Sequence, residues 1–182
     1  MSVSSFLRRL IEHLNSIGVP YMIVGSLAST YHGRPRTTED IDLVVAIEPE
    51  HVDRLVDLDP ERYYVSRDAA EDAVRRAGQF NIIDMETGWK ADLIARKRRP
   101  FSLEEFARRG MADILGVRCF VASAEDTILS KLEWAKAGES ERQLRDVKGI
   151  VETQADSLDL EYIERWARSL GVSDLWEQVR GG

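Results

Sequence analysis

A pair of aspartates inside a short apolar run constrains this chain more than any other feature. Asp40 and Asp42 lie in the segment Glu39–Ile47, whose β-branched residues and initial alternation predict a strand. Successive side chains of a strand point to opposite faces, so we expect both carboxylates on one face. A divalent cation such as magnesium, which prefers carboxylate and phosphate oxygens, would relieve their repulsion. The alternative is two exposed aspartates, each paired with an arginine.

A glycine and a serine lie shortly before this pair. Pro20–Val24 is predicted to be a short buried strand, Gly25 and Ser26 follow it, and Leu27–His32 is predicted to be a helix. Glycine permits the close approach of a ligand, and the free N–H groups at a helix start suit a phosphate, as does the Ser26 hydroxyl. The alternative is an ordinary strand-to-helix turn with Ser26 as the helix cap.

Together these two features resemble the signature of the DNA polymerase β-like nucleotidyltransferase superfamily, in which a Gly-Ser step grips phosphates and an Asp-x-Asp pair binds metal. The resemblance implies an α/β (α+β) fold, with a mixed, twisted central sheet flanked by helices and further helices at the C-terminus. It also implies a nucleoside triphosphate substrate and Mg²⁺ or Mn²⁺ as cofactor. We expect residues 1–122 to form the core and residues 123–182 to form a helical region packed against it.

A third acidic residue is usual on a later strand in that superfamily. Asp92 fits this description, because it is a single carboxylate inside the otherwise apolar segment Trp89–Ala95, which is predicted to be a strand. The resemblance therefore makes Asp92 a metal ligand alongside the earlier pair. The alternative is a strand-end aspartate that forms an ion pair with Lys90 or Arg96.

Two predicted C-terminal helices extend the resemblance to the AbiEii-type branch, which includes toxin components of bacterial toxin–antitoxin pairs. The first begins at Ser123 and carries Lys131 beside its core-facing stripe, and the second carries Arg142 and Asp146. In that branch the lysine is taken to contact the triphosphate, and the aspartate lies near the active site. The chain departs from the branch at Gly149, where a second aspartate is common. The alternatives are a solvated Lys131 and an ion pair between Arg142 and Asp146.

The resemblance implies magnesium-dependent, in-line transfer of a nucleoside monophosphate to an acceptor hydroxyl or phosphate. Two metal ions would flank the reacting phosphorus, and Asp92 would share one of them and act as general base. The expected nucleotide-binding residues are Gly25, Ser26, Arg36 and Lys131. The expected catalytic residues are Asp40, Asp42, Asp92 and Lys131, of which the three aspartates are also the expected metal ligands.

Two basic clusters accompany these segments. His32, Arg34 and Arg36 come between the Gly-Ser step and the aspartate pair, so we expect them to border the triphosphate. Arg96–Arg99 follows the strand of Asp92 and is either a solvated loop or a landing site for a polyanionic acceptor such as an RNA end. The net charge of −7 argues against broad contact with a nucleic-acid backbone, so extended DNA binding is not expected.

Composition sets limits on location. The 182-residue chain is long enough for one sizeable core and has no apolar run that could cross a membrane. Its N-terminus lacks a secretory pattern, and its single cysteine, Cys119, fits a reducing cytoplasm. Since the flanks of Cys119 are apolar, it is expected to be a buried strand residue and not a nucleophile.

Three functions remain open from the sequence. The first is transfer to RNA or protein, as a toxin with a cognate antitoxin. The second is transfer to a small molecule such as an aminoglycoside-like antibiotic, which the acidic charge balance mildly favours. The third is a non-catalytic nucleotide-binding or antitoxin-like regulatory module, and the retained Gly-Ser step and three aspartates argue against it.

Overall fold

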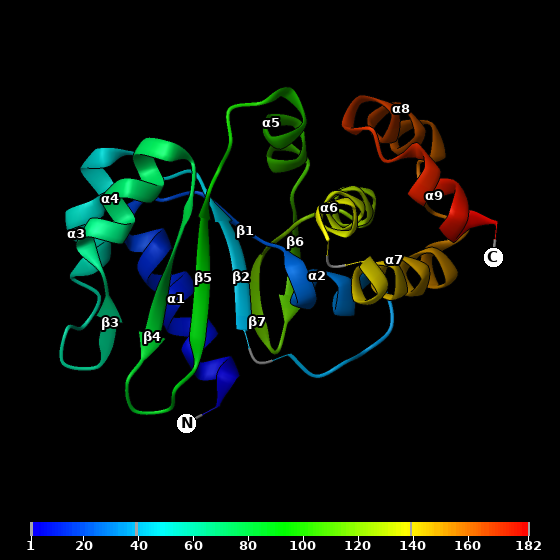
Figure 1. Cartoon of the computed structure of the whole chain (residues 1–182). Coiled ribbons are helices and arrows are strands. Elements are labelled where there is room, and N and C mark those ends of the chain that lie inside the picture. The colour runs from blue at the N-terminus through cyan, green and yellow to red at the C-terminus, as the bar shows by residue number, and fades with distance from the viewer. Residues whose placement is uncertain (1, 39, 139, 182) are drawn as a thin grey trace. The chain divides into compact units, whose positions relative to one another are not determined.

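The computed structural model describes residues 2–38, 40–138 and 140–181. The chain divides into two compact units, the first comprising Met1–Ile23 with Thr38–Val121 and the second comprising Val24–Thr37 with Ala122–Gly182. The first unit holds the sheet and the second is helical (Figure 1). The packing of residues 123–182 against a core of residues 1–122 stays a prediction. Within the described residues, no helix is long and apolar enough to span a bilayer.

The first unit is built around a mixed seven-stranded sheet with the order β3-β4-β5-β2-β1-β7-β6. β2 is parallel to β5 and β1 is parallel to β7, whereas the other neighbours are antiparallel. This confirms the predicted α/β fold with a mixed central sheet. The strands are β1 Tyr21–Ile23, β2 Asp40–Val45, β3 Tyr63–Val65, β4 Gln79–Asp84, β5 Lys90–Ala95, β6 Gly110–Ile114 and β7 Val117–Val121.

Alternation along the strands separates a core face from a more polar face. In β2, β4 and β5 every second residue is buried, and the residues between them are half-buried or exposed. The remaining elements of the unit are helical. They are α1 Val3–Ile17, the short 3₁₀ helix Pro49–His51, α3 Val52–Val56, α4 Arg67–Arg76 and α5 Pro100–Ala107.

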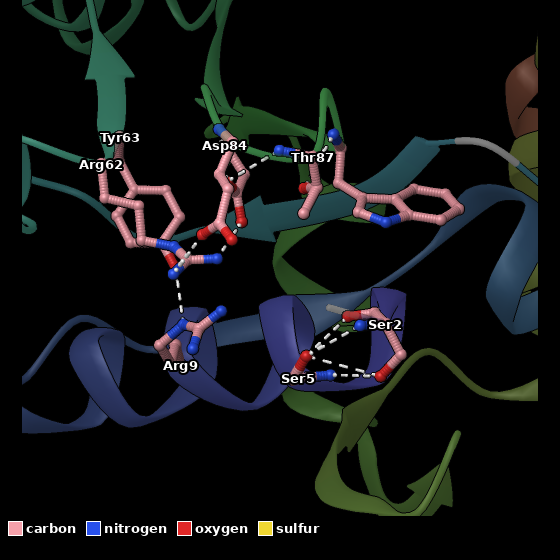
Figure 2. Close-up of polar contacts among 9 residues, drawn as sticks. Ser2, Ser5, Arg9, Arg62, Tyr63, Asp84 and Thr87 are labelled. Carbon is pink, nitrogen blue, oxygen red and sulfur yellow. Dashed lines mark hydrogen bonds and ion pairs between the residues drawn. The ribbon is translucent and has the colours of Figure 1, made fainter.

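The spacing of Phe6, Leu10, Leu14 and Ile17 predicts an amphipathic helix at the N-terminus, and α1 confirms it. The four apolar side chains of that stripe are all buried, and Arg9 on the same helix donates a hydrogen bond of 2.6 Å to the Tyr63 hydroxyl of β3 (Figure 2). The helix therefore contributes core contacts and also a hydrogen bond to the edge strand β3. The stripe consists of Phe6, Leu10, Leu14 and Ile17.

A buried aspartate closes the hairpin between β4 and β5. The backbone N–H groups of Glu86 and Thr87 donate to Asp84 Oδ1 at 3.0 and 3.3 Å, and Arg62 Nη2 donates to Oδ2 at 2.9 Å (Figure 2). Burial alone would raise the pKa of Asp84, but Arg62 and the two N–H groups lower it overall. β4 and β5 are antiparallel neighbours, as the short turn between them predicts.

Some boundaries differ from the sequence prediction for identifiable reasons. The strand predicted for residues 39–47 is β2, which spans Asp40–Val45, and Glu39 lies outside the described residues. The sequence predicts a helix over residues 102–109 with Ser102 as its cap. The helix begins instead at Pro100, because proline at the first helical position needs no partner for an N–H group. Ser102 is buried inside that helix. The edge strands β3 and β6 were not predicted.

The second unit consists of helices that contact one another. α6 begins after Ser123, whose hydroxyl accepts the Asp126 N–H at 3.1 Å, so the predicted cap is confirmed. The sequence predicts that the tryptophans of these helices are core or interface residues; Trp176 is buried, and Trp134 is 53% exposed. The helices are α2 Gly25–His32, α6 Ala124–Ala137, α7 Ser140–Gln154, α8 Leu160–Leu170 and α9 Ser173–Arg180.

The end of α2 approaches α7 closely at Gly33, which has no side chain to keep the two backbones apart. A Cβ atom on Gly33 would lie 2.8 Å from the backbone nitrogen of Ile150 and 2.9 Å from the carbonyl carbon of Gly149. For a Cβ atom on Gly149 itself, the nearest atoms belong to Arg34, with the side-chain Cγ at 3.4 Å. The glycine that replaces the second aspartate of the AbiEii-type pattern therefore belongs to a close helix contact.

This contact predicts opposite effects for two alanine substitutions. Gly33→Ala should lower the free energy of unfolding by about 1–3 kcal/mol, because its methyl group meets rigid backbone. Gly149→Ala, the matched control, should leave stability unchanged or raise it by up to about 1 kcal/mol, since alanine is favoured inside a helix. Urea unfolding followed by circular dichroism measures both, and equal midpoints for Gly33→Ala and wild type would contradict the close approach.

Candidate active site

Polar side chains form a row across three strands of the first unit. Asp42 of β2 lies directly opposite Asp92 of β5, and Asn81 of β4 lies opposite Asp92 on its other side. Paired residues share a face of the sheet, and all three are half-buried. Asp40, two residues before Asp42, lies on the same face with 51% of its side chain exposed. The alternation thus brings the three predicted carboxylates to one face; Asn81 was not singled out from the sequence.

A lysine lies among these carboxylates. Lys90 is opposite Asp40 in the strand register, and its Nζ atom lies 3.1 Å from Asp92 Oδ2 and 3.5 Å from Asp40 Oδ1. The hydrogen bond to Asp92 is the main reason that the pKa of Lys90 is raised, so the ammonium is charged at neutral pH. Of the two ion-pair partners considered for Asp92, Lys90 therefore forms the pair. The guanidinium of Arg96, the other candidate, lies over the ring of Phe106, 4.9 Å from its centroid.

We refer to five of these residues together as the carboxylate face. The carboxylate and amide oxygens of this face are the hard ligands that magnesium prefers, although the described residues contain no group of three His, Cys, Asp or Glu side chains arranged to hold a metal ion. Magnesium often takes only one or two carboxylates and completes its shell with phosphates and water. The donor set therefore fits a cation that arrives with a nucleotide. The carboxylate face comprises Asp40, Asp42, Asn81, Lys90 and Asp92.

A second polar group lies within the helical unit. The Arg36 guanidinium donates to the Ser26 hydroxyl and, from Nη2, to Asp146 Oδ2 at 3.3 Å. The Lys131 ammonium lies 2.7 Å from the same oxygen and donates to Gln143 Oε1 at 2.9 Å. In this group the carboxylate of Asp146 pairs with two basic side chains. We name the group the Asp146 cluster, and it consists of Ser26, Arg36, Lys131, Gln143 and Asp146.

Burial makes this pairing necessary. The side chains of Lys131 and Asp146 are only 6% and 10% exposed, and a buried charge is costly unless it is paired. Burial alone would raise the pKa of Asp146, but Lys131 and Arg36 lower it overall. Lys131 is therefore not a solvated lysine, and the ion-pair partners of Asp146 are Lys131 and Arg36 in place of Arg142.

Gly25 and Ser26 form the first turn of α2 itself. Gly25 has φ of +61°, in the left-handed region that glycine adopts without strain. The residue before the helix is Val24, which makes no side-chain cap, so the alternative of Ser26 as the cap is wrong. An uncapped first turn leaves N–H groups that suit an anion.

Of the three basic residues His32, Arg34 and Arg36, Arg36 joins the Asp146 cluster. Arg34 forms an exposed ion pair of 2.7 Å with Glu152. The Nε2 atom of His32 lies 2.7 Å from the carbonyl oxygen of Ala122, and burial lowers the pKa of this histidine. Arg36, which the sequence groups with Ser26 as a predicted nucleotide-binding residue, is thus the basic residue seen to contact Ser26.

The basic segment Arg96–Arg99 lies at the far end of its strand from the carboxylates. It follows the last residue of β5, which is three positions beyond Asp92, or roughly 10 Å at the usual rise of a strand. Arg96 and Arg98 line a groove of about 460 Å³ together with two arginines of α4. This position does not support a landing site for the acceptor beside Asp92.

Several solved structures similar to this chain are named as nucleotidyltransferases or nucleotidyltransferase-like proteins. The chain is similar to an antigenic nucleotidyltransferase-like protein from Paracoccidioides brasiliensis, with a TM-score of 0.59 and 16% identity over 97% of this chain and 91% of that one. It is similar to ANT(2″)-Ia in complex with adenylyl-2″-tobramycin, with a TM-score of 0.61 and 16% identity over 92% and 95% of the two chains. It is also similar to the lincomycin-bound lincosamide antibiotic adenylyltransferase LnuA, with a TM-score of 0.54 and 12% identity over 82% of this chain and 96% of that one.

These likenesses establish that the chain has the nucleotidyltransferase fold. No protein-family model matches the chain, and no curated protein matches it significantly. The AbiEii-type branch therefore stays a resemblance in sequence pattern.

The pairing of Asp146 predicts a pH dependence of stability. Because the pKa of Asp146 is lowered in the folded protein, its ionised form stabilises the fold above an unfolded-state pKa of about 3.9. That contribution is lost as the pH falls through the lower, folded-state value. Asp146→Asn should therefore lose less free energy of unfolding than wild type between about pH 6 and about pH 3, as measured by urea titration.

At neutral pH the same variant should be less stable than wild type by about 1–3 kcal/mol, because Lys131 and Arg36 lose a buried partner. Glu152→Gln, which removes the carboxylate of an exposed ion pair, serves as control and should change stability by less than about 1 kcal/mol. An unchanged pH profile in Asp146→Asn would show that Asp146 does not carry this dependence.

Proposed function

We propose that this protein is a nucleotidyltransferase that moves a nucleoside monophosphate from a triphosphate to an acceptor hydroxyl or phosphate. The observation that carries the proposal is the pairing of Asp42 with Asp92 across neighbouring strands, with Asp40 on the same face, in a chain that has the nucleotidyltransferase fold. Three carboxylates gathered on a half-buried sheet face have an energetic cost that cations offset. Handling of a metal-bound triphosphate explains this arrangement.

In this proposal Asp40, Asp42 and Asp92 hold Mg²⁺ or Mn²⁺ together with the triphosphate. The bound cation would supply charge neutralisation for the triphosphate and for the departing pyrophosphate. Asp92 accepts the proton of the acceptor hydroxyl as the acceptor oxygen bonds to the α-phosphorus. The bond between that phosphorus and the bridging oxygen then breaks, and pyrophosphate leaves.

We assign binding of the triphosphate to Gly25, Ser26, Arg36 and Lys131. The first turn of α2 offers N–H groups, Ser26 offers a hydroxyl, and the two basic side chains offer positive charge. Support comes from Asp146, whose carboxylate oxygens already accept from both cations, since phosphate oxygens are acceptors of the same kind. Asp146 acts here as a positioning residue that keeps both basic side chains oriented.

For the acceptor, we propose a small molecule with a hydroxyl group. Two of the similar structures are named for antibiotic ligands, an adenylylated tobramycin and lincomycin. The net charge of −7 also suits a cationic acceptor of the aminoglycoside type.

A second candidate is transfer to RNA or protein as the toxin of a toxin–antitoxin pair, with a cognate antitoxin as partner. The contact between Lys131 and Asp146 favours it, because these are the two residues that the AbiEii-type pattern associates with the triphosphate.

Labelling of the acceptor tests these proposals. The protein is incubated with each α-phosphate-labelled nucleoside triphosphate, magnesium and a cell extract supplemented with aminoglycosides and lincosamides, and the products are separated into RNA, protein and small molecules. Label in the small-molecule fraction supports the first acceptor, and label in RNA or protein supports the second. Absence of label from every fraction would contradict the enzymatic proposal and favour a nucleotide-binding or regulatory module.

The carboxylate face predicts which substitution removes the activity. Asp42→Asn should lower the transfer rate by about 10²-fold or more, because it removes a charged oxygen ligand at the centre of the row. Its thermal midpoint should stay close to that of wild type, since the isosteric amide keeps the strand register. Asp113→Asn, on the exposed side of β6, is the matched control and should retain full activity. Wild-type transfer by Asp42→Asn would refute the assignment.

A further inference from the structure

A groove in the first unit has no part in the proposed transfer reaction. Its volume is about 460 Å³, and it lies where the parallel strands β2 and β5 both end, beside the last turn of α4. In Figure 1, α4 and α5 lie to either side of this end of β5. We name it the arginine groove, and its charged lining residues are Glu48, Arg75, Arg76, Arg96 and Arg98.

The place and the size of the groove both favour a small ligand. Open α/β sheets bind their ligands in the crevice outside the carboxyl ends of the strands, and β2 and β5 are parallel neighbours that end together here. The volume lies within the range of about 300–1,000 Å³ that small-molecule sites occupy. The carboxylate face, in contrast, lies toward the opposite end of the same two strands.

We propose that the arginine groove binds a small molecule that carries two or more linked phosphate groups. The groove shares no residue with the carboxylate face or with the Asp146 cluster, so this inference does not rest on the proposed transfer reaction. Inorganic pyrophosphate, longer oligophosphates and free nucleotides all have the required chemistry.

The groove keeps a positive charge after its carboxylates are counted. Four guanidinium groups line it, and Glu48 is the acidic residue among the described lining residues. Asp72, which pairs with both Arg75 and Arg76, adds a second negative charge. Two positive charges therefore remain in excess, and two linked phosphate groups carry at least two negative charges at neutral pH. The aspartates of the carboxylate face lie roughly 10 Å away, about one Debye length at 0.1 M salt, so screening weakens their repulsion.

The arginines of the groove are available to a ligand. The side chains of Arg98 and its partner Glu48 are 81% and 46% exposed, and ion pairs as exposed as this contribute only about 0–1 kcal/mol. Arg96 lies over the Phe106 ring, and in the part of the chain that the structure describes no carboxylate pairs with it. A guanidinium over an aromatic ring still presents an N–H edge, which matches two oxygens of a phosphate group.

A purely structural role for these arginines makes a different prediction. The helix dipole favours basic side chains in the last turn of α4, where Arg75 and Arg76 lie. If they have that role alone, oligophosphate leaves the groove unaffected, and neutralising Glu48 changes only its ion pair with Arg98. If the groove binds phosphates, neutralising Glu48 strengthens the binding. Phosphate affinity is therefore the measurement that separates the two roles.

The test is titration of the full-length protein with inorganic tripolyphosphate in EDTA, followed by calorimetry and by nuclear magnetic resonance of the backbone N–H groups. EDTA removes the divalent cations that the proposed transfer reaction requires. In wild type the N–H signals of Ile47, Ala77 and Arg96 should shift and saturate, because these residues line the groove. Pyrophosphate and free nucleotides, titrated in the same way, identify which source of linked phosphates binds most tightly.

Two variants should change the affinity in opposite directions. Arg75→Gln/Arg98→Gln should bind tripolyphosphate at least about tenfold more weakly, because two charged donors are lost. Glu48→Gln should bind it about threefold more tightly, because a nearby negative charge is gone. All three side chains are exposed, so thermal midpoints close to that of wild type should confirm that the variants fold.

Arg67→Gln is the matched control, because it removes an exposed, ion-paired arginine from the opposite end of α4 and should bind as wild type does. Equal affinities in the double variant and wild type would overturn the inference. Signal shifts confined to the first turn of α2 would also overturn it, as would tighter binding of a short RNA without terminal phosphates. Each of these results leaves the proposed function standing, because the labelling of acceptors tests that function separately.

Discussion

The parallel pairing of β2 with β5 is the constraint on which the carboxylate face depends. The register that places Ile41 opposite Ala91 in the core also places Asp42 opposite Asp92 on the other face. A slip of one residue would turn the aspartates into the core and expose the apolar side chains, at a large cost in free energy. Burial of the apolar face therefore fixes the positions of the carboxylates, even though their like charges repel each other.

Each of the two polar sets contains its own counterion, with opposite signs. A lysine lies between aspartates on the carboxylate face, whereas Asp146 lies between Lys131 and Arg36 in the helical unit. In both sets the internal ion pairs offset part of the cost of gathering like charges.

The sequence sufficed where local pattern determines structure, and it failed where distant segments do. Alternation predicted that Asp40 and Asp42 share a face, and a short turn predicted the β4–β5 hairpin. The burial of Lys131 was missed, because a lysine beside an apolar stripe has the same local pattern whether it is covered or solvated. Its partner Asp146 also contacts Arg36, which lies 110 residues earlier, and no local pattern encodes such a contact. The three-residue strand β3 is too short to show alternation.

The segment that carries Gly25 and Ser26 has an unusual relation to the order in which the chain is synthesised. α2 is flanked in the sequence by β1 and β2 of the first unit, yet it belongs with α6 and α7, which are made about ninety residues or more later. Closing so long a loop carries an entropic cost that only the finished helices can offset. During synthesis, the contacts of α2 with α6 and α7 can therefore form only after those helices have been made, later than the strands of the sheet.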